Sequence, residues 1–146
     1  MNFGSVVRYG RAADKMKRTR VLLADDDPQV RARITTMLQA DFEVVGSVPD
    51  GHSLIEAAAR LHPDVVVTDI SMPKLDGMEA ARTIRSILPD IKFVFLTMHD
   101  GKGYRRQAQR VGAVAYILKY AALEELNNAI WHAMEGVSGG ATSSDK

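Results

Sequence analysis

Five short apolar runs alternate along this chain with five amphipathic segments, and this alternation limits the possible folds more than any other feature. The apolar runs span residues 21–24, 42–48, 65–67, 91–96 and 114–118. Short continuous runs of this kind are typical of strands buried on both faces. The intervening segments carry apolar residues at helical spacing; the first starts at Pro28, and the others cover 52–61, 76–88, 101–111 and 122–136. The alternation predicts one α/β domain, a doubly wound (βα)5 fold with a five-stranded parallel sheet.

The charges divide the chain into a basic start and a mildly acidic body. Residues 1–20 contain six basic residues and one acidic residue, whereas residues 21–146 contain 13 basic and 17 acidic residues. A basic stretch ahead of the first strand is more typical of a solvated extension than of a nucleic-acid-binding face. The end of the chain is rich in Ser, Gly and Thr, as flexible linkers are. We expect a flexible extension over 1–19, one folded domain over 20–137, and a tail or start of a linker over 138–146.

The composition disfavours several classes of protein. The chain has no cysteine, so it has neither a disulfide framework nor thiol chemistry. No apolar run approaches the roughly 18 residues of a membrane span, and the first twenty residues have no signal-peptide core. We therefore expect a cytoplasmic protein that does not act at a membrane.

Five polar residues follow the predicted strands at their carboxyl ends: Asp25, Asp26, Asp69, Thr97 and Lys119. In an open α/β sheet these ends line the crevice where ligands bind. Three nearby carboxylates repel one another unless a cation lies between them, and Mg²⁺ accepts carboxylate oxygens. With the ion bound, one carboxylate can attack phosphorus while a lysine and a hydroxyl hold the phosphoryl oxygens. The set predicts a Mg²⁺-dependent phosphoryl acceptor.

Each of these residues also has an ordinary structural explanation when it is taken alone. The acidic run before Pro28 could cap a helix, and Asp69 could be a turn residue. Thr97 is common in strands, and Lys119 could be a surface lysine. One residue suffices for a cap, however, and none of these explanations accounts for the shared sheet edge. The joint pattern therefore favours a site.

The segments that carry these residues resemble the receiver domains of bacterial two-component response regulators. They read Val21-Leu-Leu-Ala-Asp-Asp-Asp, Val65-Val-Val-Thr-Asp-Ile-Ser-Met-Pro-Lys-Leu-Asp-Gly, Phe93-Val-Phe-Leu-Thr and Tyr116-Ile-Leu-Lys. The second is the most specific, and the resemblance covers residues 20–136. The first motif and the lack of proline after the lysine are similar to the NarL/FixJ-type subgroup. The resemblance implies the flavodoxin-like strand order 2-1-3-4-5.

The resemblance also implies roles for the acidic residues. Asp69 would accept the phosphoryl group from a sensor histidine kinase. Asp26 would bind Mg²⁺ directly, Asp25 would act mainly through water, and the backbone carbonyl of Ser71 would complete the protein's metal ligands, together with Asp69.

Further roles fall on the later strands. Thr97 and Lys119 would hold the phosphoryl group, and Tyr116 would turn inward when Thr97 moves toward it. Ser71 and His99 stand where the family tunes dephosphorylation. Such a domain is a signalling switch and not an enzyme, although receivers catalyse their own phosphorylation and dephosphorylation.

The sequence departs from the family pattern in three places. Tyr120 replaces the familiar proline after Lys119, so we expect a trans bond there, because a non-proline cis bond costs several kcal/mol. Met98 is bulkier than the small residue often found after the threonine and would restrict access to the phosphate. Members of the subgroup continue into a helix-turn-helix output domain that controls transcription, whereas this sequence ends at Lys146. We expect a stand-alone receiver or a fragment of a longer regulator.

Alternatives to the phosphorylation switch remain at this point. The chain could be a stand-alone or degenerate receiver that acts only as a protein-binding module. A phosphatase with an aspartyl-phosphate intermediate is disfavoured because Ser71 stands where that class needs a second acid. A flavodoxin is disfavoured because the first loop is acidic and would repel a phosphate.

Two partner surfaces are plausible from the sequence. A homodimer could form through helix 4, strand 5 and helix 5, because the fourth helix carries Lys102, Arg105, Arg106 and Arg110. Helices 1 and 5 offer a competing dimer surface. We expect no direct DNA binding by this chain.

Overall fold

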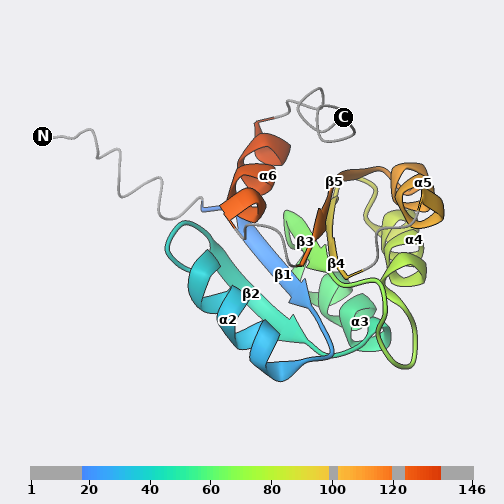
Figure 1. Ribbon diagram of the computed structural model, residues 1–146, viewed down its shortest axis with the longest axis horizontal. Helices are drawn as coiled ribbons and strands as arrows, with labels where there is room; N and C mark the ends of the chain where they lie inside the picture. The colour runs from blue at the N-terminus through green and yellow to red at the C-terminus, as the bar shows by residue number, and fades with distance from the viewer. Residues whose placement is uncertain (1–17, 99–101, 120–123, 136–146) are drawn as a thin grey trace, which may run out of the picture.

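The computed structural model describes residues 18–98, 102–119 and 124–135 (Figure 1). Five parallel strands form one sheet in the order β2-β1-β3-β4-β5. The strands are β1 (Arg20–Ala24), β2 (Glu43–Val48), β3 (Val65–Thr68), β4 (Lys92–Thr97) and β5 (Ala113–Leu118). The helices are α2 (Pro28–Leu38), α3 (Gly51–Leu61), α4 (Gly77–Ile87), α5 (Lys102–Arg110) and α6 (Glu124–Met134). The predicted fold class and strand order are therefore confirmed.

Aspartate side chains start three of the helices. Asp27, Asp50 and Asp76 precede α2, α3 and α4, and each accepts hydrogen bonds from backbone N–H groups of the first turn. These bonds satisfy donors that have no partner inside the helix. Within the acidic run before Pro28, Asp27 is the residue that caps the helix.

The ends of the second predicted helix illustrate how local signals set boundaries. His62, before Pro63, has a left-handed backbone (φ 49°, ψ 62°) and ends α3, in accord with the bias against helical geometry before proline. The helix begins at Gly51, one residue earlier than predicted. A Cβ on Gly51 would lie 2.2 Å from the Leu75 carbonyl oxygen, so α3 starts against the loop that follows β3.

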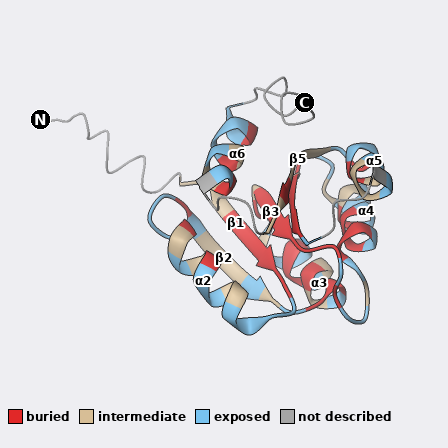
Figure 2. Ribbon diagram, in the orientation of Figure 1, coloured by how far each residue is buried: buried red, intermediate tan, exposed pale blue. Residues whose placement is uncertain are grey.

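The sheet separates two apolar cores, and Figure 2 shows that the strands β1 and β3 between them are largely buried. Helices α3, α4 and α5 cover one face, and α2 and α6 cover the other. Alternate strand residues belong to opposite cores, as the two-residue period of a strand requires: Phe93 and Phe95 face one core, whereas Val94 and Leu96 face the other. The central strands β1 and β3 are almost entirely buried, which explains their continuous apolar runs.

Within the described part of the chain, no helix is both long enough and apolar enough to cross a lipid bilayer. Among the described residues, Arg18 already contacts the domain, because its guanidinium donates to the carbonyl oxygens of Gln39 and Phe42. The last residues of the predicted extension thus touch the folded body.

Candidate metal centre

Backbone hydrogen bonds place three strand-end residues at one edge of the sheet. The Asp25 N–H donates to Val48 O at 3.0 Å, and the Asp69 N–H donates to Ala24 O at 3.0 Å. The Lys119 N–H donates to Thr97 O at 2.8 Å. Each bond continues the parallel ladder one residue past the strand, so the positions of these side chains follow from strand register.

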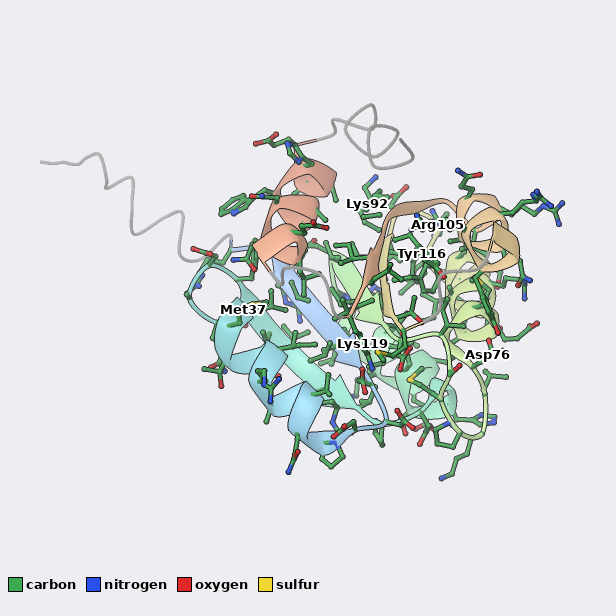
Figure 3. All side chains as sticks on the ribbon, in the orientation of Figure 1. Met37, Asp76, Lys92, Arg105, Tyr116 and Lys119 are labelled. Atoms are coloured by element: carbon green, nitrogen blue, oxygen red, sulfur yellow. The ribbon has the colours of Figure 1, made fainter. Side chains whose placement is uncertain are left out.

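A single ammonium joins the two buried carboxylates of this edge. Lys119 Nζ lies 2.6 Å from Asp25 Oδ2 and 3.0 Å from Asp69 Oδ2 (Lys119 is labelled in Figure 3). The side chain of Lys119 is only 14% exposed, and those of Asp25 and Asp69 are 2% and 7% exposed. Sequence positions 25, 69 and 119 are therefore in direct contact.

The other oxygen of each buried carboxylate accepts a backbone N–H. Asp27 N donates to Asp25 Oδ1 at 2.9 Å, and Ile70 N donates to Asp69 Oδ1 at 2.7 Å. Both carboxylates thus have one oxygen held by the main chain and one held by Lys119. This arrangement fixes their orientation, because rotation of either group would break a bond at each end.

The cluster holds more negative than positive charge. Burial raises the pKa of Asp25 above 3.8, and this effect outweighs the hydrogen bond from Lys119. Burial alone would lower the pKa of Lys119, but its hydrogen bonds with Asp25 and Asp69 outweigh that effect and raise it. Both shifts favour the protonated forms, as expected where two carboxylates share one ammonium.

The donor set fits a hard divalent cation. Asp25, Asp26 and Asp69 each offer a carboxylate oxygen, and these oxygens lie within 4.8 Å of one another. Asp26 is exposed, whereas the other two are buried, so the cluster opens to solvent on the Asp26 side. Oxygen-only ligands with one solvent-facing carboxylate suit Mg²⁺, which keeps several waters. The residues present therefore fit the ion that the sequence predicts.

Gly77 brings the start of α4 against the backbone of Asp69. A Cβ at Gly77 would lie 1.9 Å from Asp69 O, and Gly77 N donates to Ile70 O at 2.7 Å. Thr68 Oγ1 also donates to Asp69 O, at 2.8 Å. The loop that carries Asp69 is thus held from both sides, and only glycine fits at position 77.

Four of the remaining residues named from the sequence lie within the described part of the chain. Thr97 is fully buried at the end of β4, and Tyr116 is half-buried on β5. Ser71 is exposed, and Met98 is 61% exposed, so its side chain extends into solvent.

Four of the sequence predictions concern residues outside the described part of the chain. These are the role of His99, the trans Lys119–Tyr120 peptide bond, most of the extension predicted over 1–19, and the tail predicted over 138–146.

Two residues near the centre were not predicted from the sequence. Arg31 Nη1 donates to Asp25 O at 2.7 Å and links α2 to the acidic loop. Nothing in the pattern of α2 singles out this arginine. Gly77 did have a signal in the sequence, because it ends the most specific of the matching segments, but an Asp-Gly pair is also typical of an ordinary turn.

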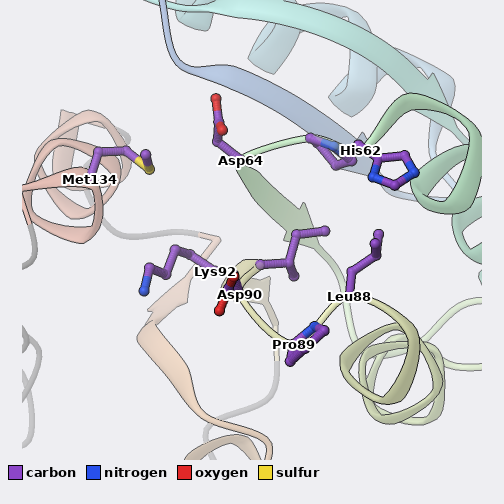
Figure 4. A pocket seen from close by; sticks show the side chains of 9 residues that line it. His62, Asp64, Leu88, Pro89, Asp90, Lys92 and Met134 are labelled. Carbon is purple, nitrogen blue, oxygen red and sulfur yellow. The ribbon is translucent and has the colours of Figure 1, made fainter.

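A pocket of about 300 Å³ lies at the opposite end of the sheet (Figure 4). Its lining includes residues that precede β3 and β4, namely His62 to Asp64 and Leu88 to Ile91, together with Met134 of α6. Among the described residues, none of the strand-end set lines it. The acidic cluster, and not this pocket, is the candidate site.

Comparisons with known proteins agree with this geometry. The family model described as response regulator receiver domain matches residues 21–131. The chain is 44% identical over 119 residues to the uncharacterized transcriptional regulatory protein YxjL of Bacillus subtilis, a match covering 80% of this chain and 55% of that protein. It is 39% identical over 120 residues to the response regulator GacA of Pseudomonas aeruginosa, covering 80% and 56%. The chain thus spans about half the length of these curated relatives.

Solved structures show the same similarity. A DNA-binding response regulator of the LuxR family from Staphylococcus aureus superposes with a TM-score of 0.75 at 28% identity, covering 79% of this chain and 98% of that one. The isolated receiver domain of RcsB from Salmonella enterica, solved with the phosphomimetic BeF3⁻, gives a TM-score of 0.75 at 27% identity and covers 82% and 90%.

Proposed function

The chain belongs to the response regulator receiver domain family, and from this premise we propose that it is a Mg²⁺-dependent switch phosphorylated on Asp69. The observation that carries the proposal is the contact of Lys119 with both Asp25 and Asp69, next to the third carboxylate of Asp26. A nucleophile, a metal site and a cation for the phosphoryl oxygens thereby share one crevice. The phosphoryl donor is a sensor histidine kinase.

The acidic residues have different tasks because their surroundings differ. Asp26 is exposed and binds Mg²⁺ directly, whereas Asp25 already accepts two hydrogen bonds and acts mainly through water. The carbonyl of Ser71 is the backbone ligand. Mg²⁺, when bound, balances negative charge on the carboxylates and on the incoming phosphoryl group.

The transfer itself requires little covalent chemistry from the protein. One oxygen of Asp69 attacks phosphorus, an O–P bond forms, the N–P bond to the kinase histidine breaks, and the imidazole leaves and takes a proton from solvent. Lys119 Nζ lies 3.0 Å from Asp69 Oδ2 and binds an oxygen of the phosphoryl group once Asp69 carries it. The Thr97 hydroxyl donates a hydrogen bond to a second phosphoryl oxygen. Ser71 and His99 adjust the rate at which water removes the group.

The output of the switch runs through Thr97 and Tyr116. These residues lie on adjacent strands β4 and β5, and movement of Thr97 toward the phosphoryl group lets Tyr116 turn inward. The change reaches either the face of α5, β5 and α6 or the face of α2 and α6, where a homodimer forms. Because relatives are named as transcriptional regulatory proteins and the match covers only about half of their length, the domain controls transcription through an output domain. The activity stays confined to the chain's own phosphorylation and dephosphorylation.

Phosphorylation can be tested with a small phosphodonor and intact-protein mass spectrometry. Wild-type protein with Mg²⁺ gains the mass of one phosphoryl group, and removal of Mg²⁺ by a chelator abolishes the gain. Asp69→Asn gains nothing. Asp90→Asn is the matched control, because Asp90 is exposed and lines the pocket at the other end of the sheet. No modification of either protein would leave the protein-binding module as the function, whereas equal modification of wild type and Asp69→Asn would show that another residue is the acceptor.

A further inference from the structure

The guanidinium of Arg105 lies over the ring of Tyr116. The distance from Arg105 Cζ to the ring centroid is 4.6 Å, and Figure 3 labels the two residues close together near α5 and β5. A guanidinium within about 6 Å of a ring centroid is attracted by the negative face of the ring. Arg105 and Tyr116 therefore form a cation–π pair that connects the helix to the strand.

Tyr116 lies on the same face of the sheet as Thr97. It pairs in register with Phe95, and Phe95 and Thr97 share a face because they are two residues apart on β4. Tyr116 packs, partly buried, against the core that contains Phe95. Arg105 therefore covers a ring that lies on the strand next to β4 and on the same face of the sheet as Thr97.

We propose that Arg105 is a positioning residue that holds Tyr116 in its resting orientation and so sets how often the switch turns without phosphorylation. The proposal rests on the function proposed above, in which Tyr116 turns inward on activation. When the Tyr116 ring turns inward it moves away from the Arg105 guanidinium, so the active state lacks the cation–π contact. A contact present in only one of two states biases their populations by its own free energy.

The effect on Tyr116 depends on the position of Arg105 and not on the overall charge of helix α5. Helix α5 also bears Arg106 and Arg110, which are exposed, whereas Arg105 is half-buried beside Tyr116. Removing the charge of Arg106 changes the net charge of the helix equally but leaves the ring contact in place.

A second arginine–ring pair shows what a purely structural contact looks like in this domain. Arg85 Cζ lies 5.1 Å from the ring centroid of Phe93, which is fully buried. Its guanidinium also donates to the carbonyl oxygens of Pro89, Val111 and Gly112. That arginine joins two loops over a fully buried ring, whereas Arg105 covers a half-buried ring on β5.

The proposal can be tested by ¹⁹F NMR on protein labelled with 3-fluorotyrosine, with the Tyr116 signal assigned from Tyr116→Phe. Spectra of the wild type without ligand, and with beryllofluoride and Mg²⁺, define the two end states. In the unliganded protein we expect Arg105→Gln to raise the ratio of active-like to resting signal about two- to five-fold, the range expected for an exposed cation–π pair. Arg105→Lys keeps a cation and restores the resting signal in part. Arg106→Gln, the matched control, matches the wild type.

The outcomes separate this proposal from the proposed function. If beryllofluoride moves the wild-type Tyr116 signal but Arg105→Gln behaves like Arg106→Gln, the role of Arg105 is wrong and the switch stands. If beryllofluoride leaves the wild-type signal unchanged, the coupling of Asp69 to Tyr116 is wrong, and Arg105 sets no switch. Glutamine is a good helix former, and far-UV circular dichroism checks that each variant is folded. If Arg105→Gln does not fold, the ¹⁹F spectrum of Arg105→Lys tests the proposal instead. A Tyr116 signal in Arg105→Lys identical to that of the wild type would overturn it.

Discussion

Lys119 Nζ lies closer to Asp25 Oδ2, at 2.6 Å, than to Asp69 Oδ2, at 3.0 Å. One ammonium therefore serves two buried carboxylates and is held more tightly by the one that is not the proposed phosphoacceptor. The lysine keeps Asp25 in place while remaining within reach of Asp69. Substitution of Lys119 should consequently affect both the stability of the fold and the acceptor.

Lys119→Met should destabilise the metal-free protein, because removal of the cation leaves two buried carboxylates without their shared partner. The expected loss in the free energy of unfolding is on the order of 3 kcal/mol, measured by urea denaturation in the presence of a chelator. Lys74→Met is the control: Lys74 is 69% exposed and 3.9 Å from Asp50, and its loss should cost less than about 0.5 kcal/mol. Equal effects of the two substitutions would contradict the role of Lys119.

Mg²⁺ should stabilise the wild-type fold, since the cation binds the folded carboxylate cluster and not the unfolded chain. At a concentration of 100 times the Kd, the expected gain is about 2.7 kcal/mol, visible as a rise in Tm. Asp26→Asn should reduce this gain because it removes the solvent-facing ligand. An unchanged Mg²⁺ response in Asp26→Asn would show that the ion binds elsewhere.

Gly77→Ala should displace the start of α4 or the Asp69 loop, because the new Cβ would lie 1.9 Å from Asp69 O. We expect a loss of stability of about 3 kcal/mol, as for other severe steric clashes in packed regions, together with weaker phosphorylation. Unfolding can be followed by the fluorescence of Trp131, whose ring centroid lies 5.1 Å from that of Phe42. Gly103→Ala is the matched control: a Cβ there meets nothing within 4 Å, and alanine in a helix should stabilise by about 0.5–1 kcal/mol.

Asp50→Ala should cost about 0.5–2 kcal/mol at neutral pH, the usual contribution of a helix N-cap. The Ser53 N–H holds the pKa of Asp50 below 3.8, despite burial, which acts in the other direction. The ionised cap therefore stabilises the fold above about pH 3.8, and this contribution disappears as the pH falls through the lower pKa of the folded state. The difference in unfolding free energy between wild type and Asp50→Ala should shrink over that acidic range. A difference independent of pH would show that the charge of Asp50 plays no part.

The alternation of apolar runs with helical patterns determined the fold class, because the periods of strands and helices are properties of contiguous residues. Local boundary signals, such as a cap within the acidic run before Pro28 and a helix end before Pro63, likewise depend on neighbours within a turn or two. Placement of Asp25, Asp69, Thr97 and Lys119 at strand ends then followed from the parallel sheet.

The tertiary structure decided which of these groups touch. That Lys119 reaches Asp25 more closely than Asp69, that Gly77 abuts Asp69 O, and that Arg105 covers Tyr116 are relations between separate elements. Such distances depend on strand register and on the packing of helices against the sheet. Local sequence patterns do not determine these distances. A shift of about 1 Å between two elements makes or breaks a hydrogen bond but leaves the periodicity of each sequence segment unchanged.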